Sequence, residues 1–271
     1  MGPICVFDSG YGGLTVLKSL KEKLPSHEFL YLGDNARTPY GPRSFETIYE
    51  YTLEAVKFLF EKGCYLVILA CNTASAKALR TIQQNDLPRI APEKRVLGVI
   101  RPTAEIIGQK SISKQVGIVG TVGTVKSDSY LLEIKKQDAT VQVYQQACPL
   151  WVPLVEAGEV ESEGAEYFVK KYIHELLSQN HNIDVLLLAC THYPLLTKLI
   201  ERYTPKNIEI LSQGPIIASS LADYLKRHPE IEKRCLKTSE INFLTTDDTT
   251  IFDKKAIQFF DTPIYSQKVH F

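Results

Sequence analysis

Short apolar runs of strand length alternate along the chain with longer amphipathic segments, and this alternation restricts the fold more than any other feature. The runs are Ile4–Phe7, Phe29–Leu32, Leu66–Ala70, Val96–Ile100, Val116–Val119, Val141–Tyr144, Val185–Ala189, Ile208–Leu211 and Ile241–Leu244. Most are apolar at every position instead of every second one, which is typical of strands that helices cover on both faces. We therefore predict an α/β fold with mainly parallel sheets flanked by helices.

Two of the amphipathic segments carry the start and stop signals of helices. The segment from Ser44 to Lys62 has apolar residues at helical spacing, begins with a capping residue and is followed by Gly63. The segment from Ser162 to Gln179 has a similar pattern. Both are predicted to be helices between strands.

Part of the sequence occurs twice. Tyr65–Thr73 is similar to Asp184–His192, because each is an apolar strand pattern that ends in Ala-Cys and continues with polar residues suited to capping a helix. The two cysteines, Cys71 and Cys190, lie nearly half the chain apart, and a strand with a polar, glycine-containing end precedes each. Two duplicated α/β halves related by a pseudo-two-fold would explain this spacing. We predict a first domain of residues 1–98 with 212–271 and a second of residues 99–211.

The charge balance excludes several classes of protein. Lys and Arg together number 31, as do Asp and Glu, so the formal net charge is zero and a polyanion-coating role is not expected. With 44% hydrophobic residues the chain is also unlike a disordered one. No apolar stretch is long enough to span a bilayer, and the N-terminus lacks the pattern of a secretory signal. We expect a cytoplasmic protein with neither a nucleic-acid nor a membrane partner.

Six cysteines are scattered along the chain, too few and too spread for a disulfide scaffold. No Cys-x-x-Cys pair occurs, which disfavours a structural zinc site, and no metal is expected. The composition therefore predicts reduced thiols. Outside the repeat, we interpret four as structural: Cys5, Cys64, Cys148 and Cys235.

The two repeated cysteines stand where chemistry is expected in such a fold. Cys71 and Cys190 each end a predicted strand, and sites in open α/β sheets form outside the carboxyl ends of the strands. A helix that starts one or two residues later would present N–H groups that favour a thiolate, whereas a free thiol with a pKa of about 8.5 is mostly protonated at neutral pH. A single buried cysteine is usually a core residue. Two in matched surroundings favour a functional pair.

Other polar loops follow predicted strands. Asp8–Gly13 contains three glycines that let backbone N–H groups approach an anion, but it lacks a Walker lysine and matches the dinucleotide fingerprint poorly. Gly33–Gly41 is rich in turn residues and is either a connector or a binding loop. Thr121 and Thr124 either bind a ligand or cap a helix. His192 is a candidate functional residue because it lies two residues after Cys190.

Five segments together resemble a known family. They are Phe7–Thr15, Gly33–Gly41, Ala70–Ser75, Gly120–Val125 and Ala189–Pro194, and they resemble the signature segments of the glutamate racemases, within the cofactor-independent Asp/Glu racemase group. The match runs in order from residue 4 to about residue 215. Tyr11 and Ser212–Gly214 depart from the usual pattern, at positions where no chemistry is expected.

The resemblance implies a two-base reaction. Racemisation needs a base on one face of the α-carbon and an acid on the other, and the family's pattern assigns these roles to Cys71 and Cys190, one from each domain, in a cleft between them. Cys71 would act on D-glutamate and Cys190 on L-glutamate. Asp8, beside Cys71, and Glu156 with His192, beside Cys190, would position or assist the thiols. Without the resemblance, Glu156 is equally an ordinary surface carboxylate.

The resemblance also implies which residues hold the substrate. They are Asp8, Ser9, Tyr40, Gly41, Asn72, Thr73, Thr121, Thr124, Thr191 and His192. Most are neutral donors, so a dianionic substrate would be held by hydroxyls and amides, and we interpret Arg37 as a surface charge of its loop. No lysine stands in a Schiff-base context, so no cofactor is expected. The family supplies D-glutamate for peptidoglycan, and a homodimer is expected.

Three other functions stay open on the sequence. A racemase of the same fold could act on aspartate or a hydantoin. A cysteine hydrolase would use Cys190 as its nucleophile with His192. A non-catalytic module would bind an amino acid without changing it.

Overall fold

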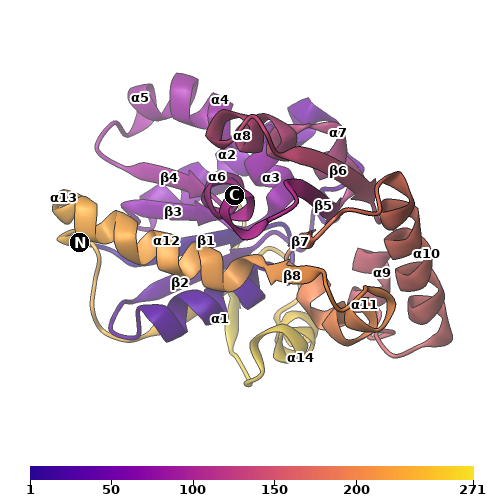
Figure 1. Cartoon of the computed structure of the whole chain (residues 1–271). Helices are drawn as coiled ribbons and strands as arrows, with labels where there is room; N and C mark the ends of the chain where they lie inside the picture. Colours follow the sequence, from indigo (N-terminus) through magenta and orange to yellow (C-terminus); the bar gives the residue numbers. More distant parts are fainter. The chain divides into compact units, whose positions relative to one another are not determined.

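The computed structural model describes residues 1–271, and its contacts divide the chain into two units. One unit is Met1–Val99 together with Gly214–Phe271, and the other is Ile100–Gln213. Each holds a parallel sheet flanked by helices, which confirms the predicted α/β class (Figure 1). None of the helices combines the length and the apolar character needed to cross a bilayer.

The first unit is built on six parallel strands in the order β10-β9-β2-β1-β3-β4. Their bounds are β1 Ile4–Asp8, β2 Phe29–Gly33, β3 Leu66–Leu69, β4 Arg95–Gly98, β9 Ile241–Thr245 and β10 Ser266–Lys268. The three strands β1, β2 and β3 are buried at every residue, as their apolar sequences predict. The sequence did not predict β10, because this short edge strand reads Ser-Gln-Lys and carries no apolar pattern.

The helices of the first unit include the one predicted after Ser44. Their bounds are α1 Gly13–Lys23, α2 Phe45–Glu61, α3 Asn72–Lys77, α4 Leu79–Thr81, α5 Leu87–Ile90, α12 Gln213–Arg227, α13 Pro229–Glu232 and α14 Thr249–Phe260, with a π-helical turn at Ile82–Asp86. The Ser44 hydroxyl accepts the Thr47 N–H at 3.2 Å, and Gly63 follows the helix at a φ of +91°. Both signals therefore act as predicted.

The second unit has four parallel strands in the order β6-β5-β7-β8. The strands are β5 Gln115–Gly120, β6 Gln142–Ala147, β7 Val185–Ala189 and β8 Glu209–Ser212. The helices are α6 Ile100–Lys110, α7 Val122–Lys126, α8 Ser129–Gln137, α9 Trp151–Glu156, α10 Glu163–Gln179 and α11 Thr197–Tyr203, with a 3₁₀ helix at Tyr193–Leu196. The predicted cap of α10 is confirmed, since the Ser162 hydroxyl accepts the Ala165 N–H at 3.1 Å.

The strand order places Cys71 and Cys190 at equivalent positions, each within its own unit. The order β2-β1-β3-β4 recurs as β6-β5-β7-β8, so β3 and β7 each lie beside the first strand of their unit. Phe7 of β1 pairs with Leu69 of β3, and Gly120 of β5 pairs with Ala189 of β7. In both units, therefore, the residues that follow the first and third strands emerge side by side at the carboxyl edge of the sheet.

The unusual Tyr11 joins the loop after β1 to helix α14. Its ring is 6% exposed and stacks on Phe252 and Phe259, with ring centroids 5.3 and 5.9 Å away. In Figure 1, α14 accordingly lies close to α1, which follows this loop. A large aromatic side chain at this position is thus part of the core.

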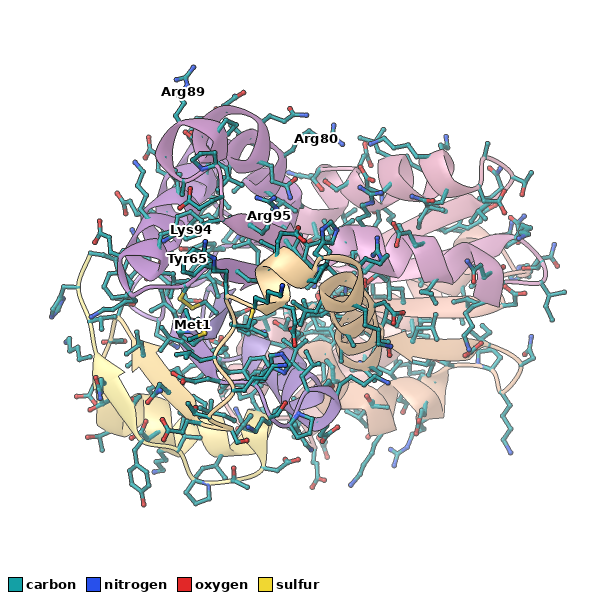
Figure 2. The ribbon with its side chains drawn as sticks, turned by 90° about the vertical axis from the view of Figure 1, so that its left-hand side faces the viewer. Met1, Tyr65, Arg80, Arg89, Lys94 and Arg95 are labelled. Carbon is teal, nitrogen blue, oxygen red and sulfur yellow. A yellow bond between two sulfur atoms is a disulfide. The ribbon has the colours of Figure 1, made fainter.

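The expectation of reduced thiols is wrong at Cys5 and Cys64, which form a disulfide. Cys5 lies on β1 and Cys64 directly precedes the neighbouring β3, and their Cα atoms are 6.2 Å apart, within the usual range for a disulfide. Figure 2 shows this sulfur–sulfur bond near the labelled Tyr65. The other two non-repeated cysteines are free and buried, and burial raises the pKa of Cys235 to about 12.

Candidate functional site

Cys71 follows β3 and caps the short helix α3. Its sulfur accepts the Ala74 N–H at 3.4 Å and lies 3.4 Å from the Ser9 hydroxyl oxygen. The side chain is almost buried, with 6% of the residue exposed. The sulfur thus receives an N–H from the first turn of α3, as the sequence predicted for a helix that starts just after the cysteine.

Asp8 ends β1 and lies at the same edge of the sheet as Cys71. It is 1% exposed, and its Oδ1 accepts the Gly10 N–H at 3.0 Å. Gly13 is required by close packing, because a Cβ there would lie 2.5 Å from the Asp8 Cβ. The glycines of this loop thus serve in part to hold Asp8 in place.

The other expected substrate residues of the first unit are largely buried. Asn72 and Thr73 form the first turn of α3 and are 3% and 2% exposed. Tyr40 is 1% exposed, and its hydroxyl donates to Asp34 Oδ2 at 2.5 Å. Burial, and then the charge of Asp34, raise the pKa of Tyr40 far above its usual value, so the hydroxyl remains a donor to Asp34. Gly41, the next residue, is partly exposed.

The interpretation of Arg37 as a surface charge is wrong. Its side chain is 21% exposed, and its Nε lies 2.7 Å from Asp34 Oδ2. Its Nη1 lies 2.5 Å from Glu54 Oε2, on α2. Helix α2 supplies both the second carboxylate and a side chain that covers the guanidinium. Neither can be predicted from the sequence of the loop.

Cys190 directly follows β7 and is paired with an imidazole. Its sulfur lies 3.9 Å from His192 Nδ1, and His192 Nε2 lies 2.9 Å from Glu156 Oε1. The expected helix start after Cys190 is displaced: a 3₁₀ helix begins at Tyr193, and Thr191 and His192 form the turn before it. Within this unit the structure thus brings three predicted catalytic residues together, and Glu156 is no ordinary surface carboxylate.

The position of His192 fixes its charge. Burial lowers its pKa, but the hydrogen bonds and charges of Cys190 and Glu156 outweigh burial and raise it to about 10. At neutral pH the ring is therefore an imidazolium, with Nε2 donating to Glu156 and Nδ1 facing the sulfur. Cys190 therefore faces a cation.

Among the expected threonines of the second unit, Thr121 caps a helix. The Thr121 hydroxyl accepts the Thr124 N–H at 3.2 Å and lies 3.1 Å from the Thr124 hydroxyl, at the start of α7. Thr124 is fully buried and Thr191 is 5% exposed. Strand register sets the residues after β5 beside Cys190, so a capping role does not remove Thr121 from the candidate site.

Sequence reasoning missed a buried polar cluster near Cys190. The Gln213 side-chain amide donates to the Thr103 hydroxyl at 3.0 Å and to the Tyr130 hydroxyl at 2.7 Å. Burial, with a smaller effect from the charge of Cys190, raises the pKa of Tyr130. The one signal in the sequence was the departure from the family pattern at Ser212–Gly214. No group of three or more His, Cys, Asp and Glu side chains is arranged to hold a metal ion.

The sequence matches a known family over most of its length. The family model described as Asp/Glu/Hydantoin racemase covers residues 14–221. The chain belongs to this Asp/Glu/hydantoin racemase family, which confirms the resemblance found in the motifs.

Individual relatives narrow the comparison to glutamate racemases. The glutamate racemase of a Sulfurihydrogenibium species is 39% identical over 253 residues, covering 93% of this chain and 91% of the relative. The crystal structure of a glutamate racemase isoform from Bacillus anthracis has a TM-score of 0.90 at 31% identity, covering 99% of this chain and 97% of that one. The Francisella tularensis glutamate racemase in complex with D-glutamate has a TM-score of 0.88, also at 31% identity and with the same coverage.

Proposed function

We propose that this chain is a glutamate racemase that interconverts L- and D-glutamate without a cofactor. The observation that carries the proposal is the repeated one: in each unit, a cysteine at the end of the third strand lies beside hydrogen-bond donors. Such a pair is what racemisation requires, and the relatives described above are glutamate racemases. The enzyme is an isomerase of the amino-acid racemase class.

The proposed reaction uses the two sulfurs in turn. One thiolate takes the α-proton, and the thiol on the other side of the carbon returns a proton to the opposite face. We assign the removal of the proton from D-glutamate to Cys71 and from L-glutamate to Cys190. This requires that the two domains, residues 1–98 with 212–271 and residues 99–211, bind one substrate molecule in a cleft between them.

The surrounding groups support these roles. The α-proton is far less acidic than a thiol, so the carbanion-like transition state must be stabilised electrostatically. The imidazolium of His192, held by Glu156, supplies positive charge beside Cys190. Ser9 lies beside Cys71, and Asp8 ends the strand that pairs with β3.

We propose that mostly neutral hydroxyls and amides, together with Asp8 and His192, hold the two carboxylates and the amino group of glutamate. The residues are Asp8, Ser9, Tyr40, Gly41, Asn72, Thr73, Thr121, Thr124, Thr191 and His192. For Tyr40, whose hydroxyl donates to Asp34, we assign the contact to the backbone around Gly41.

A solvent-exchange experiment tests the function. Incubation with L-glutamate in heavy water should place deuterium on the α-carbon, whereas a cysteine hydrolase using Cys190 and His192, or a binding module, would leave it unlabelled. Both Cys71→Ser and Cys190→Ser should abolish racemisation, with Cys235→Ser as the matched control that retains it. Activity confined to aspartate or a hydantoin would overturn the choice of substrate, and full activity in Cys71→Ser would overturn the two-base mechanism.

Three broader statements stay predictions. The D-glutamate would serve peptidoglycan and hence cell-wall synthesis, the enzyme would work in the cytoplasm, and it would be a homodimer. Sedimentation of the purified chain would test the last of these directly.

A further inference from the structure

Asp34 is a buried carboxylate that joins three loops at the carboxyl edge of the first sheet. It is fully buried, and its N–H donates to the carbonyl of Asp8 at 3.0 Å. Its Oδ1 accepts the hydroxyl of Thr246, after β9, at 2.9 Å, and its Oδ2 accepts the hydroxyl of Tyr40 at 2.5 Å. The end of β1 and the loops that follow β2 and β9 are therefore tied together at one residue.

Arg37 supplies the counter-charge that this burial requires. A carboxylate without a partner is costly inside a protein, and the Arg37 Nε lies 2.7 Å from Asp34 Oδ2. The same guanidinium reaches Glu54 of α2 through Nη1, so its planar fork joins two carboxylates at once. It thereby fixes the loop of residues 33–41 to α2.

Two aromatic rings cover the Arg37 guanidinium. One comes from α2 and the other from the C-terminal residue. The Arg37 Cζ lies 4.2 Å from the centroid of the Tyr51 ring and 5.0 Å from that of Phe271. Phe271 in turn stacks on Phe58 of α2, with centroids 4.9 Å apart. The rings cover part of the guanidinium, and the Asp34 carboxylate that it pairs with is fully buried, which strengthens the attraction between these two groups.

We propose that Arg37 is a positioning residue of the racemase, which acts through Asp34 to hold Tyr40 and Gly41 where they bind glutamate. The inference rests on the proposed function. Arg37 would act through Asp34 rather than on either cysteine. The loop of residues 33–41 is thus a binding loop rather than a connector.

The second unit contains the same three groups in an exposed setting. Arg202 Nη1 lies 2.9 Å from Glu166 Oε1, which also accepts the hydroxyl of Tyr203. The side chains of Arg202 and Glu166 are 60% and 41% exposed, whereas that of Asp34 is fully buried. Exposed ion pairs contribute little, so Arg202→Gln is a matched control for the loss of an arginine from an Arg–carboxylate–Tyr cluster.

The first test compares steady-state constants of Arg37→Gln and Arg202→Gln. Because the loop would hold the substrate equally in the ground and transition states, Arg37→Gln should raise KM for both enantiomers by about tenfold or more and change kcat by less than about threefold. Arg37→Lys keeps the charge but not the fork, so its KM should be more than about threefold above that of the wild type and below that of Arg37→Gln. Adding Asp34→Asn to Arg37→Gln should recover part of the lost affinity, since no unpaired charge then remains buried.

A KM for Arg37→Gln within about twofold of that for Arg202→Gln overturns the inference. Should Arg37→Gln not fold, Arg37→Lys decides by the same criterion. Urea unfolding of all variants distinguishes a loss of stability from a loss of substrate affinity. A loss of stability alone would leave the KM of the folded fraction unchanged.

Hydrogen exchange supplies a readout that needs no substrate. The amides of Tyr40 and Gly41 should exchange faster in Arg37→Gln than in Arg202→Gln, and equal rates would contradict the positioning role. A wild-type protein that shows no racemisation of glutamate contradicts the proposed function instead. The two failures are therefore distinguishable.

Discussion

The substitution Glu156→Gln tests the electrostatics at Cys190 most directly. Glu156 is the carboxylate that receives His192 Nε2 at 2.9 Å, and glutamine keeps its size while removing its charge. His192 is buried, with a pKa raised from 6.5 to about 10. Loss of the carboxylate should therefore lower the pKa of the imidazole.

The size of the change follows from the contact. A hydrogen bond to a charged group contributes about 1.5–3 kcal/mol, and one pKa unit corresponds to about 1.4 kcal/mol, so the pKa of His192 should fall by about 1–2 units. Because folding raises this pKa, the associated stability is complete below pH 6.5 and is lost as the pH rises toward about 10. In Glu156→Gln the loss should be complete at a lower pH.

Two measurements check this result. A titration of the His192 ring by NMR gives its pKa, and urea unfolding between pH 6 and pH 10, roughly the window set by that pKa, gives the stability. Glu159→Gln, which removes an exposed carboxylate three residues further on, is the control. The assignment of the raised pKa to the Glu156 contact would be refuted if the pKa of His192 moved by less than about 0.5 unit in Glu156→Gln. It would also be refuted if the pKa of His192 moved equally far in the control Glu159→Gln.

Three further predictions concern stability, and an unchanged urea midpoint would contradict each. Tyr11→Ala removes a ring stacked on two phenylalanines of α14 and should lower the free energy of unfolding by about 3–4 kcal/mol at an unchanged slope. Tyr130→Phe deprives the buried Gln213 amide of one hydrogen bond and should cost about 1–2 kcal/mol. Reduction of the Cys5–Cys64 disulfide, which joins residues 59 positions apart, should cost about 2–4 kcal/mol in the wild type and nothing in Cys5→Ser.

The features that were predicted from the sequence depend on neighbouring residues. The caps at Ser44 and Ser162 were confirmed because a cap is a hydrogen bond across three residues. The buried strands were confirmed because their continuous apolar pattern reports burial on both faces. The same local reasoning placed Cys71 and Cys190 at strand ends.

The features that were missed depend on partners far along the chain. The cover of Arg37 comes from Tyr51 and Phe271, and no spacing rule links these positions. The Cys5–Cys64 disulfide follows from strand order, which the sequence did not supply. The short strand β10 is held by pairing with β9 and has no apolar pattern of its own.

The two cysteines occupy matching backbone positions but meet different charges. Cys190 faces the imidazolium of His192, whereas Cys71 receives an N–H and lies beside the Ser9 hydroxyl. Under the proposed mechanism each sulfur must serve as base in one direction and as acid in the other, so the two directions start from unlike thiolates. Since L- and D-glutamate have equal free energies, kcat/KM must be the same in both directions for every variant. Glu156→Gln, which changes the Cys190 side alone, should therefore alter the ratio of the two kcat values and leave the two kcat/KM values equal.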